Sequence, residues 1–374
     1  MKSRARESFA AQIRAAMSRL RPSRHFVLVL GVLLIAQLVG AAALLSMRTE
    51  SDRLGATEPA LFRLDPDAKY PPAPTPTPKP VRKVSAVKKP APVASQRVVA
   101  KPKPKPRKPV LTLPALRGLG AWVDLYDYGK PANTPVTTLV AQAASQHVST
   151  IWVETSRFNT ADIAYPDALG ALMDASASRG IRVIAWVLPE FRSVSADLAK
   201  AKAAAAFRSP RGHRFAALGI DIEVSSGAKP PERTAELNSL MRGVYGHVGM
   251  SVVAITPPPV GFSRNPSYWP GFPWHDLAAH AHAIATMGYW SFSHDAHPDE
   301  YTASVLRETR SLVGNSSYPI HVIGGLAADT TPAGAAAFCR AARSGGAVGA
   351  SLYDLTSTPS SLWAPLQACR KVGY

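Results

Sequence analysis

Two patterns of apolar and polar positions alternate along residues 117–374. Short, nearly continuous apolar runs recur at intervals of roughly 25–35 residues, and such runs are typical of strands in a parallel sheet that is covered on both faces. We expect strands at 118–128, 149–155, 181–190, 215–224, 249–259, 283–292, 319–327 and 347–355. The segments between them are rich in alanine, and we expect helices at 134–148, 167–180, 196–207 and 299–314.

Eight strand–helix units in one stretch of this length predict an α/β fold, the (β/α)8 TIM barrel, over residues 117–374. A doubly wound α/β sheet is the alternative. That fold would favour a glycine-rich phosphate loop after the first strand, whereas the chain there reads AWVDLYDYGKP. The barrel therefore remains the predicted fold.

A second kind of apolar segment lies near the N-terminus, at residues 26–47, and contains no charged residue. Roughly 20 apolar residues suffice to cross a bilayer as a helix. Residues 1–25 carry seven Lys/Arg against one acid, so the positive-inside rule predicts a cytoplasmic tail followed by a single transmembrane anchor. A cleaved signal peptide is the alternative, but signal peptides usually have shorter apolar regions. The anchor and the signal peptide both place the barrel outside the cytoplasm. With the anchor, the protein stays attached to the cell membrane.

Residues 48–116 have the composition of an extended spacer rather than a folded domain. Fifteen prolines occur between Pro59 and Pro114, interspersed with Lys and Arg as in KPKPKPRKP. Proline fixes φ and removes a backbone donor, so we expect a disordered, polyproline-like linker. Its positive charge suits binding to anionic wall polymers, and equally suits a spacer that merely repels itself.

The net charge of +18 first suggests nucleic-acid binding, but its distribution argues against it. Residues 117–374 contain twenty-one Lys/Arg against nineteen acids, so the excess lies in the N-terminal tail and the linker. We therefore expect no nucleic-acid partner. Phosphate loops, serine-hydrolase elbows and nicotinamide fingerprints are also missing from the sequence, and we expect no cofactor.

Active sites of such barrels lie at the C-terminal ends of the strands, and acids gather there in this sequence. The run GIDIEV places Asp221 and Glu223 two positions apart, so both side chains lie on one face of the fourth strand. Turning two charges toward the outer helices would be costly, which favours the barrel mouth. A structural ion pair with Arg182, Arg214 or another barrel arginine is the alternative. Other strand-end acids are Asp124, Glu154, Glu190 and Asp354.

GIDIE on the fourth strand and MGYW on the sixth resemble the chitinase-like (family 18) glycoside hydrolases. By position, this resemblance implies that Glu223 is the general acid, that Asp221 orients an N-acetyl group and that Tyr289 hydrogen-bonds it. The chain departs from the family pattern at Ala216, Gly219 and Trp290. The early Asp124 and the D-x-E run also resemble the lysozyme-like (family 25) muramidases.

The chemistry of the residues agrees with glycoside cleavage, which needs one protonated carboxyl and one ionised group. A neighbouring Asp221 raises the pKa of Glu223 by like-charge repulsion. Sugars stack on aromatic rings. We expect substrate to be bound by the strand-end acids together with the aromatic residues Tyr126, Trp290, Tyr268 and Trp269. Tyr268 and Trp269 belong to the long loop after the fifth strand. Trp122, Trp152 and Trp186 are expected to fill the core.

These features predict a membrane-anchored glycosidase acting on cell-wall or exported polysaccharide that contains amino sugars. The alternatives are a barrel that has lost catalysis and binds glycan or serves as an envelope scaffold, and a protein that acts through its Lys/Pro segment. The end of the seventh strand offers Asp329 instead of a second Glu, which favours an inverting or substrate-assisted route.

Two smaller features complete the expectations. The cluster SHDAHPDE is suited to starting a helix more than to binding a metal, and we expect no metal. Cys339 and Cys369 lie in the last two expected helices, where they form either a disulfide or two separate buried thiols.

Overall fold

The computed structural model describes residues 113–130, 133–223, 229–291, 293 and 295–374. The predicted tail at 1–25, the predicted anchor at 26–47 and most of the predicted linker at 48–116 lie outside the described residues. Within the part of the chain that is described, no helix combines the length and the apolar character needed to cross a bilayer.

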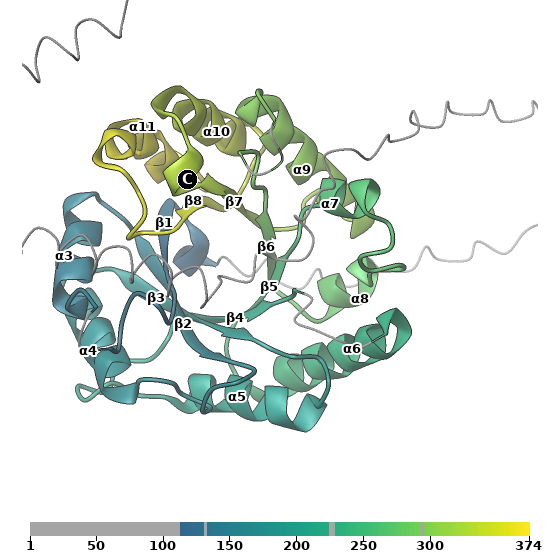
Figure 1. Cartoon of the computed structure of the whole chain (residues 1–374), viewed down its shortest axis with the longest axis horizontal. Coiled ribbons are helices and arrows are strands. Elements are labelled where there is room, and N and C mark those ends of the chain that lie inside the picture. The colour runs from purple at the N-terminus through teal and green to yellow at the C-terminus, as the bar shows by residue number, and fades with distance from the viewer. Residues whose placement is uncertain (1–112, 131–132, 224–228, 292, 294) are drawn as a thin grey trace, which may run out of the picture. The chain divides into compact units, whose positions relative to one another are not determined.

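Eight parallel strands close into a barrel in sequence order, with β1 pairing β8, so the predicted TIM-barrel fold is confirmed (Figure 1). All eight expected strands are present, and their paired regions are shorter than most of the apolar runs that predicted them. The strands are β1 (Leu119–Val123), β2 (Thr150–Arg157), β3 (Arg182–Leu188), β4 (Ala217–Asp221), β5 (Val252–Thr256), β6 (Ala283–Met287), β7 (Ile320–Leu326) and β8 (Gly349–Tyr353).

Helices surround the barrel as an outer layer (Figure 1). They are α3 (Val136–Ser145), α4 (Pro166–Ala177), α5 (Val194–Ala206), α6 (Pro230–His247), α7 (Pro259–Arg264), α8 (Trp274–Ala279), α9 (Pro298–Leu312), α10 (Pro332–Ser344) and α11 (Trp363–Leu366). Short 3-10 turns are η2 (Pro114–Leu116), η3 (Ala327–Asp329), η4 (Ser360–Leu362) and η5 (Gln367–Lys371).

Local chemistry explains where several of these helices begin. Proline starts α4, α6, α7, α9 and α10, where the missing N–H is not needed for an intrahelical bond. Ser193 caps α5 by accepting a hydrogen bond from the Ala196 amide, and Thr331 caps α10 in the same way.

The barrel interior is filled on one side by three tryptophans. The ring of Trp122 stacks on that of Trp152 with centroids 4.6 Å apart, and it meets the edge of Trp186, from the non-adjacent strand β3, at 6.0 Å. All three are buried, so their predicted assignment to the core is confirmed. At Gly219 a Cβ atom would lie 2.7 Å from Ile255 Cδ1, so the packing leaves no room for a side chain there.

A network of hydrogen bonds between buried polar groups begins at Trp122. Trp122 Nε1 donates to Ser351 Oγ at 2.8 Å, and Nε2 of the buried His321 lies 2.9 Å from the same oxygen. Nδ1 of His321 lies 3.2 Å from the Leu116 carbonyl oxygen. Burial lowers the pKa of His321 to about 4, so the imidazole is neutral at pH 7.

The end of the barrel where the strands begin is closed by the segment before β1. Leu113 and Leu116 are buried, and Thr150 Oγ1 donates to the Ala115 carbonyl oxygen at 2.6 Å. Residues 113–116 therefore pack against the barrel just before the predicted start of the domain at 117.

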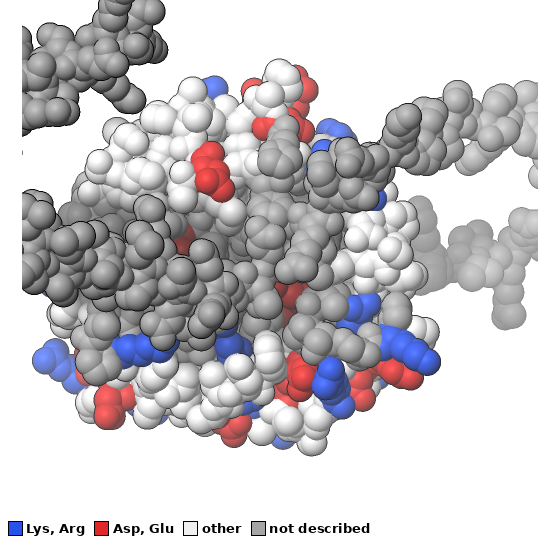
Figure 2. Space-filling view, in the orientation of Figure 1, with Lys and Arg blue, Asp and Glu red and all other residues white. Residues whose placement is uncertain are grey.

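Cys339 on α10 and Cys369 in η5 form a disulfide, with sulfur atoms 2.00 Å apart. Of the two alternatives for this pair, the structure has the disulfide. Lys and Arg lie beside Asp and Glu along the visible edge of the domain, in keeping with its nearly balanced composition (Figure 2).

Candidate active site

The three residues expected to act in catalysis come together at the C-terminal ends of the strands. Asp221 is the last residue of β4, Glu223 follows two positions later, and Tyr289 follows β6 by two residues. Burial raises the pKa of the Tyr289 hydroxyl well above its usual range, and the nearby charges of Glu223 and Asp221 raise it further. Strands β4 and β6 lie on either side of β5, so these residues reach the same part of the mouth from two different strands.

Both acids of the pair favour the protonated form. Burial raises the pKa of Glu223 to about 7, and the charge of Glu154 adds to this while Arg157 opposes it. Burial also raises the pKa of Asp221 well above its usual range, followed by the charges of Glu223 and Glu154. Among the described residues, no hydrogen bond reaches the buried Oδ1 of Asp221. A proton is therefore retained in this pair near neutral pH.

The cation that faces this pair is Arg157, at the end of β2. Its Nε donates to Glu154 Oε1 at 2.8 Å and its Nη2 to Glu154 Oε2 at 2.5 Å. Glu154 is fully buried and also accepts a hydrogen bond from the Leu125 amide at 3.1 Å. Nη1 of Arg157 donates to the hydroxyl oxygen of Tyr126 at 2.7 Å, and the guanidinium lies 4.6 Å from the centroid of that ring.

The structural ion pair considered for Asp221 and Glu223 does not form within the described residues. Arg182 begins β3 and Arg214 precedes β4, so both lie at the opposite end of the strands, and both are exposed. Glu154 instead takes Arg157 as its partner. A protein that keeps Asp221 buried without a paired cation leaves its carboxyl available for another role.

The other side of the mouth is formed by the ends of β1 and β8. Tyr353 donates from its hydroxyl to Asp124 Oδ2 at 2.7 Å, and Asp124 Oδ1 accepts from the Tyr126 amide at 2.7 Å. Asp127 accepts from the Asp124 amide at 3.0 Å and from Thr356 Oγ1 at 2.6 Å. Burial, aided by the charge of Asp124, raises the pKa of Asp127 to about 7.

Asp354 completes this second group of acids. One carboxylate oxygen each from Asp124, Asp127 and Asp354 lies within 4.8 Å of the others, which is the spacing of ligands around a cation. Asp354 is itself held by hydrogen bonds to its Oδ1 from the Ser357 amide at 2.7 Å and from Thr356 Oγ1 at 2.9 Å. Two groups of acids therefore line one mouth, and Tyr289 responds to the charges of both.

The structure corrects the placement of Trp290. This residue is buried, with its ring 5.0 Å from that of Phe338 on α10, and a Cβ atom at Gly324 would lie 2.5 Å from it. Trp290 thus packs between β7 and α10, in the helix layer, and is not a sugar-stacking ring at the mouth. The tight turn after β6 explains this, because it directs the neighbouring Tyr289 and Trp290 to different sides.

Tyr268 and Trp269 are also placed differently from the prediction. Both are buried. The ring of Trp269 makes edge-to-face contacts with Phe191 and Phe272. Its Nε1 donates to Thr234 Oγ1 at 2.8 Å, and the guanidinium of Arg233 lies 4.2 Å from its ring centroid. The loop after β5 is long and aromatic enough to form a small core of its own. Tyr268 and Trp269 are therefore buried although they lie in a loop.

Two other predicted binding residues differ in their surroundings. Tyr126 is 52% exposed at the mouth, as a stacking residue requires. Glu190 is partly exposed, and its carboxylate lies 3.4 Å from Arg192 Nε. The charged neighbours that shift the pKa of Glu223 come from β2 rather than from β3, where Glu190 lies. Glu190 is therefore the weakest of the predicted bases.

Sequence reasoning missed Arg157, because the expected second strand ended at residue 155. In the structure β2 continues to Arg157 with a register shift between Glu154 and Ser156, which turns Arg157 back onto Glu154. The E-x-x-R spacing was the available signal. In the segment SHDAHPDE, His294 lies outside the described residues, and Asp295 accepts a hydrogen bond from the His297 amide at 2.8 Å just before α9.

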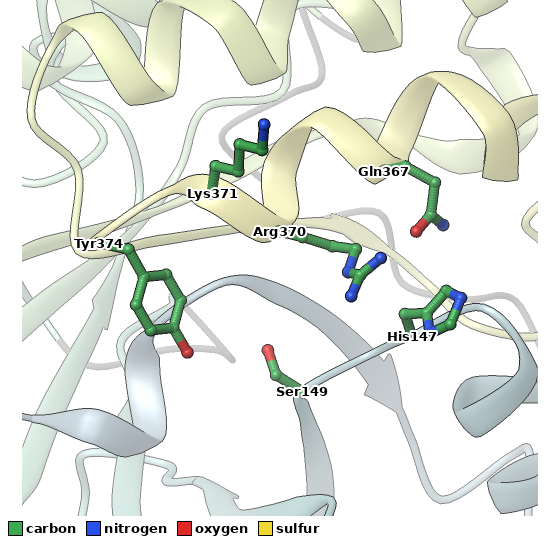
Figure 3. Close-up of a pocket in the computed structure, with 6 residues that line it drawn as sticks. All are labelled: His147, Ser149, Gln367, Arg370, Lys371 and Tyr374. Carbon is green, nitrogen blue, oxygen red and sulfur yellow. The ribbon is translucent and has the colours of Figure 1, made fainter.

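A cavity of about 420 Å³ lies far from these acids, at the end where the strands begin (Figure 3). It is lined by His147, Ser149, Gln367, Arg370, Lys371 and Tyr374. In Figure 3 the side chains of Ser149, Arg370 and Tyr374 point toward the same space. Because active sites of this fold lie at the opposite end, this cavity is separate from the candidate site.

Comparison with known proteins identifies the fold but no family. No family model matches the sequence, and no curated protein sequence matches it. An endo-1,4-beta-mannanase structure from Rhizomucor miehei superimposes with a TM-score of 0.50 at 7% identity, covering 69% of this chain and 94% of that one. A chitinase from Chromobacterium violaceum gives 0.49 at 14% identity, covering 67% and 98%. The PgaB glycoside hydrolase domain from Bordetella bronchiseptica gives 0.49 at 12%, covering 68% and 99%. The chain therefore has a TIM-barrel fold that is also found in glycoside hydrolases.

Proposed function

We propose that this protein is a glycoside hydrolase that acts on cell-wall or exported polysaccharide, with Glu223 as its general acid. The observation that carries the proposal is the pair at the end of β4, with Asp221 buried, Glu223 partly buried and the pKa of Glu223 raised to about 7. A carboxyl with that pKa is protonated over much of the range below neutrality, so it can give its proton to a leaving oxygen. The barrel fold, shared with the mannanase, supplies a suitable scaffold.

The neighbours of Glu223 divide the remaining roles. Burial and the charge of Glu154 keep Glu223 protonated. Asp221 orients the sugar, while the hydroxyl of Tyr289 donates a hydrogen bond to a substrate oxygen. Asp124 and Asp354 line the mouth on the β1–β8 side. Tyr126 offers an exposed ring for a sugar to stack on.

The cellular setting belongs to the same proposal and rests on sequence. A single span at 26–47 with a cytoplasmic N-terminus would anchor the protein in the cell membrane, and the proline-rich linker would hold the barrel out toward the wall glycan. The Lys and Arg of that linker are suited to contact anionic wall polymers.

The test compares full-length protein, purified in detergent, with its Glu223→Gln and Glu308→Gln variants. Each variant replaces one carboxylate by an amide, and Glu308 lies on α9 away from the mouth, with Ser304 as its hydrogen-bond partner. Each protein is incubated with wall and exopolysaccharides, and released reducing ends are measured. We expect release by the wild type and by Glu308→Gln, and loss of at least about a hundredfold in Glu223→Gln.

Two results would contradict this proposal. Equal release by Glu223→Gln and the wild type would remove Glu223 as the acid. No release by any of the proteins, combined with retention of the same polysaccharide in a pull-down, would leave a glycan-binding barrel without catalysis. Stability of each variant is measured by thermal unfolding, so that loss of activity is not confused with loss of fold.

A further inference from the structure

The mouth contains many more carboxyl groups than cations. Six acids lie at the strand ends or directly after them: Asp124, Asp127, Glu154, Asp221, Glu223 and Asp354. Within the described residues, the cation in direct contact with this group is Arg157, and both of its hydrogen bonds to an acid go to Glu154. The other five carboxyls have no ion pair in the described part of the chain.

A second observation indicates that this excess has a ligand. Asp221 is 8% exposed, and its Oδ1 has no hydrogen-bond partner among the described residues. Leaving a buried carboxyl oxygen without a hydrogen-bond partner costs free energy, and a bound group that forms a hydrogen bond with it would recover that cost. Asp221 shares the mouth with Glu223 and Glu154, so the missing donor would arrive from the space between the two groups of acids.

The opposite group shows which chemistry fits. The oxygen atoms of Asp124, Asp127 and Asp354 lie within 4.8 Å of one another, and hydrogen bonds from Tyr353 and Thr356 hold Asp124 and Asp127 in place. An ammonium group carries three N–H donors and one positive charge, so it can bond to several carboxylate oxygens at once. A uronic acid would add a like charge, and an N-acetyl group would leave the negative charge of the mouth uncompensated.

We propose that the glycan bound at this mouth carries free ammonium groups, as in a polymer of amino sugars whose amines are not acetylated. This inference rests on the proposed function and names its substrate class. The ammonium group lies on the β1–β8 side, against Asp124, Asp127 and Asp354, and the sugar ring extends from there toward Asp221 and Glu223. Tyr126 stands beside this position with its exposed ring.

The test measures binding of a glucosamine tetrasaccharide and of its fully N-acetylated counterpart to the full-length protein by calorimetry. It is carried out at about pH 6, where an ordinary amine is protonated. The Glu223→Gln variant is titrated in parallel, which separates binding from any hydrolysis. Asp354→Asn removes one charge at the proposed ammonium site, and Asp127→Asn removes a carboxyl that is mostly protonated at this pH. Glu308→Gln removes one charge on the outer helix α9.

We expect the free-amine oligosaccharide to bind at least about tenfold more tightly than the acetylated one, because hydrogen bonds between charged groups are the stronger kind. The preference should weaken in high salt, should fall about tenfold in Asp354→Asn, and should remain in Glu308→Gln. It should fall less in Asp127→Asn, because that carboxyl is mostly protonated at this pH. Persistence of the preference in Asp354→Asn and Asp127→Asn would overturn the proposed position of the amine.

Other outcomes separate this inference from the proposed hydrolase activity. Equal binding of the two oligosaccharides, or tighter binding of the acetylated one, overturns the inference even if hydrolysis is observed. Preferential, salt-sensitive binding of the free amine without release of reducing ends supports the inference and contradicts the hydrolase. If calcium alone binds at this site and the amine shows no preference, the acids form a metal site and the inference is wrong.

Discussion

The guanidinium of Arg157 donates two hydrogen bonds to the carboxylate of Glu154, from Nε to Oε1 at 2.8 Å and from Nη2 to Oε2 at 2.5 Å. Glu154 is fully buried, and its charge raises the pKa of both Asp221 and Glu223, whereas the charge of Arg157 lowers them. This pair on β2 therefore sets the electrostatic balance for the acids on β4. A protonated general acid depends on both members of the pair.

Replacing Arg157 by Met should destabilise the fold by about 3 kcal/mol, because it leaves the buried Glu154 without its cation. Urea unfolding measures this change. The double variant Glu154→Gln/Arg157→Met should recover much of the loss, since no buried charge remains. Arg307→Met, on the exposed side of α9, is the matched control and should change stability little. If the single and double variants lose the same stability, the pair has no electrostatic role.

Activity should fall as the pH rises through about 7, because the general acid Glu223 then loses its proton. Initial rates of polysaccharide cleavage, measured as a function of pH, give the midpoint of this alkaline loss of activity. Arg157 lowers the pKa of Glu223, so in Arg157→Met the midpoint should move to higher pH. A midpoint that moves to lower pH, or that does not move, would contradict the assignment of Glu223 as the titrating acid.

Glu223→Gln should stabilise the protein at alkaline pH while it abolishes cleavage. The pKa of Glu223 is higher in the folded than in the unfolded state, so its contribution to stability is present at low pH and is lost as the pH rises through about 7. The amide has no such loss. We expect the variant to match the wild type at about pH 4 and to exceed it by on the order of 3 kcal/mol at about pH 8. Thermal unfolding at the two pH values decides this.

His321 should show the opposite dependence. Burial lowers its pKa to about 4, so its contribution to stability is present above about 6.5, the usual histidine pKa, and is lost as the pH falls toward 4. The wild type should lose on the order of 3 kcal/mol relative to His321→Gln across that range. His297→Gln, which removes an exposed histidine, should run parallel to the wild type. If the stability of His321→Gln and that of the wild type change with pH in the same way, His321 is not kept neutral by burial.

Removing the disulfide with Cys339→Ala and Cys369→Ala together should lower the free energy of unfolding by roughly 3–4 kcal/mol, since the bond closes a loop of about thirty residues. Denaturant unfolding of the double variant and of the wild type measures the loss. The wild type treated with a reducing agent should approach the double variant. An unchanged midpoint in the double variant would mean that packing of α10 against η5 is sufficient.

Much of the fold was readable from the sequence because a buried parallel strand must be apolar on both faces. All eight expected strands occur, and period-two alternation is the basis on which Asp221 and Glu223 were predicted to share one face. The same reasoning did not place Trp290, Tyr268 and Trp269. Strand alternation ends where a tight turn or a long loop begins, and an aromatic residue beyond that point can face either solvent or a neighbouring helix.

The sequence by itself determined the eight-unit barrel, the acids at its strand ends and the core tryptophans, because all of these depend on local periodicity. Tertiary structure alone decided that Arg157 pairs with Glu154, that Tyr353 holds Asp124 across 229 positions of sequence, and that Cys339 joins Cys369. These relationships depend on closure of the barrel and on a register shift in β2, which bring side chains together by geometry that no local pattern records.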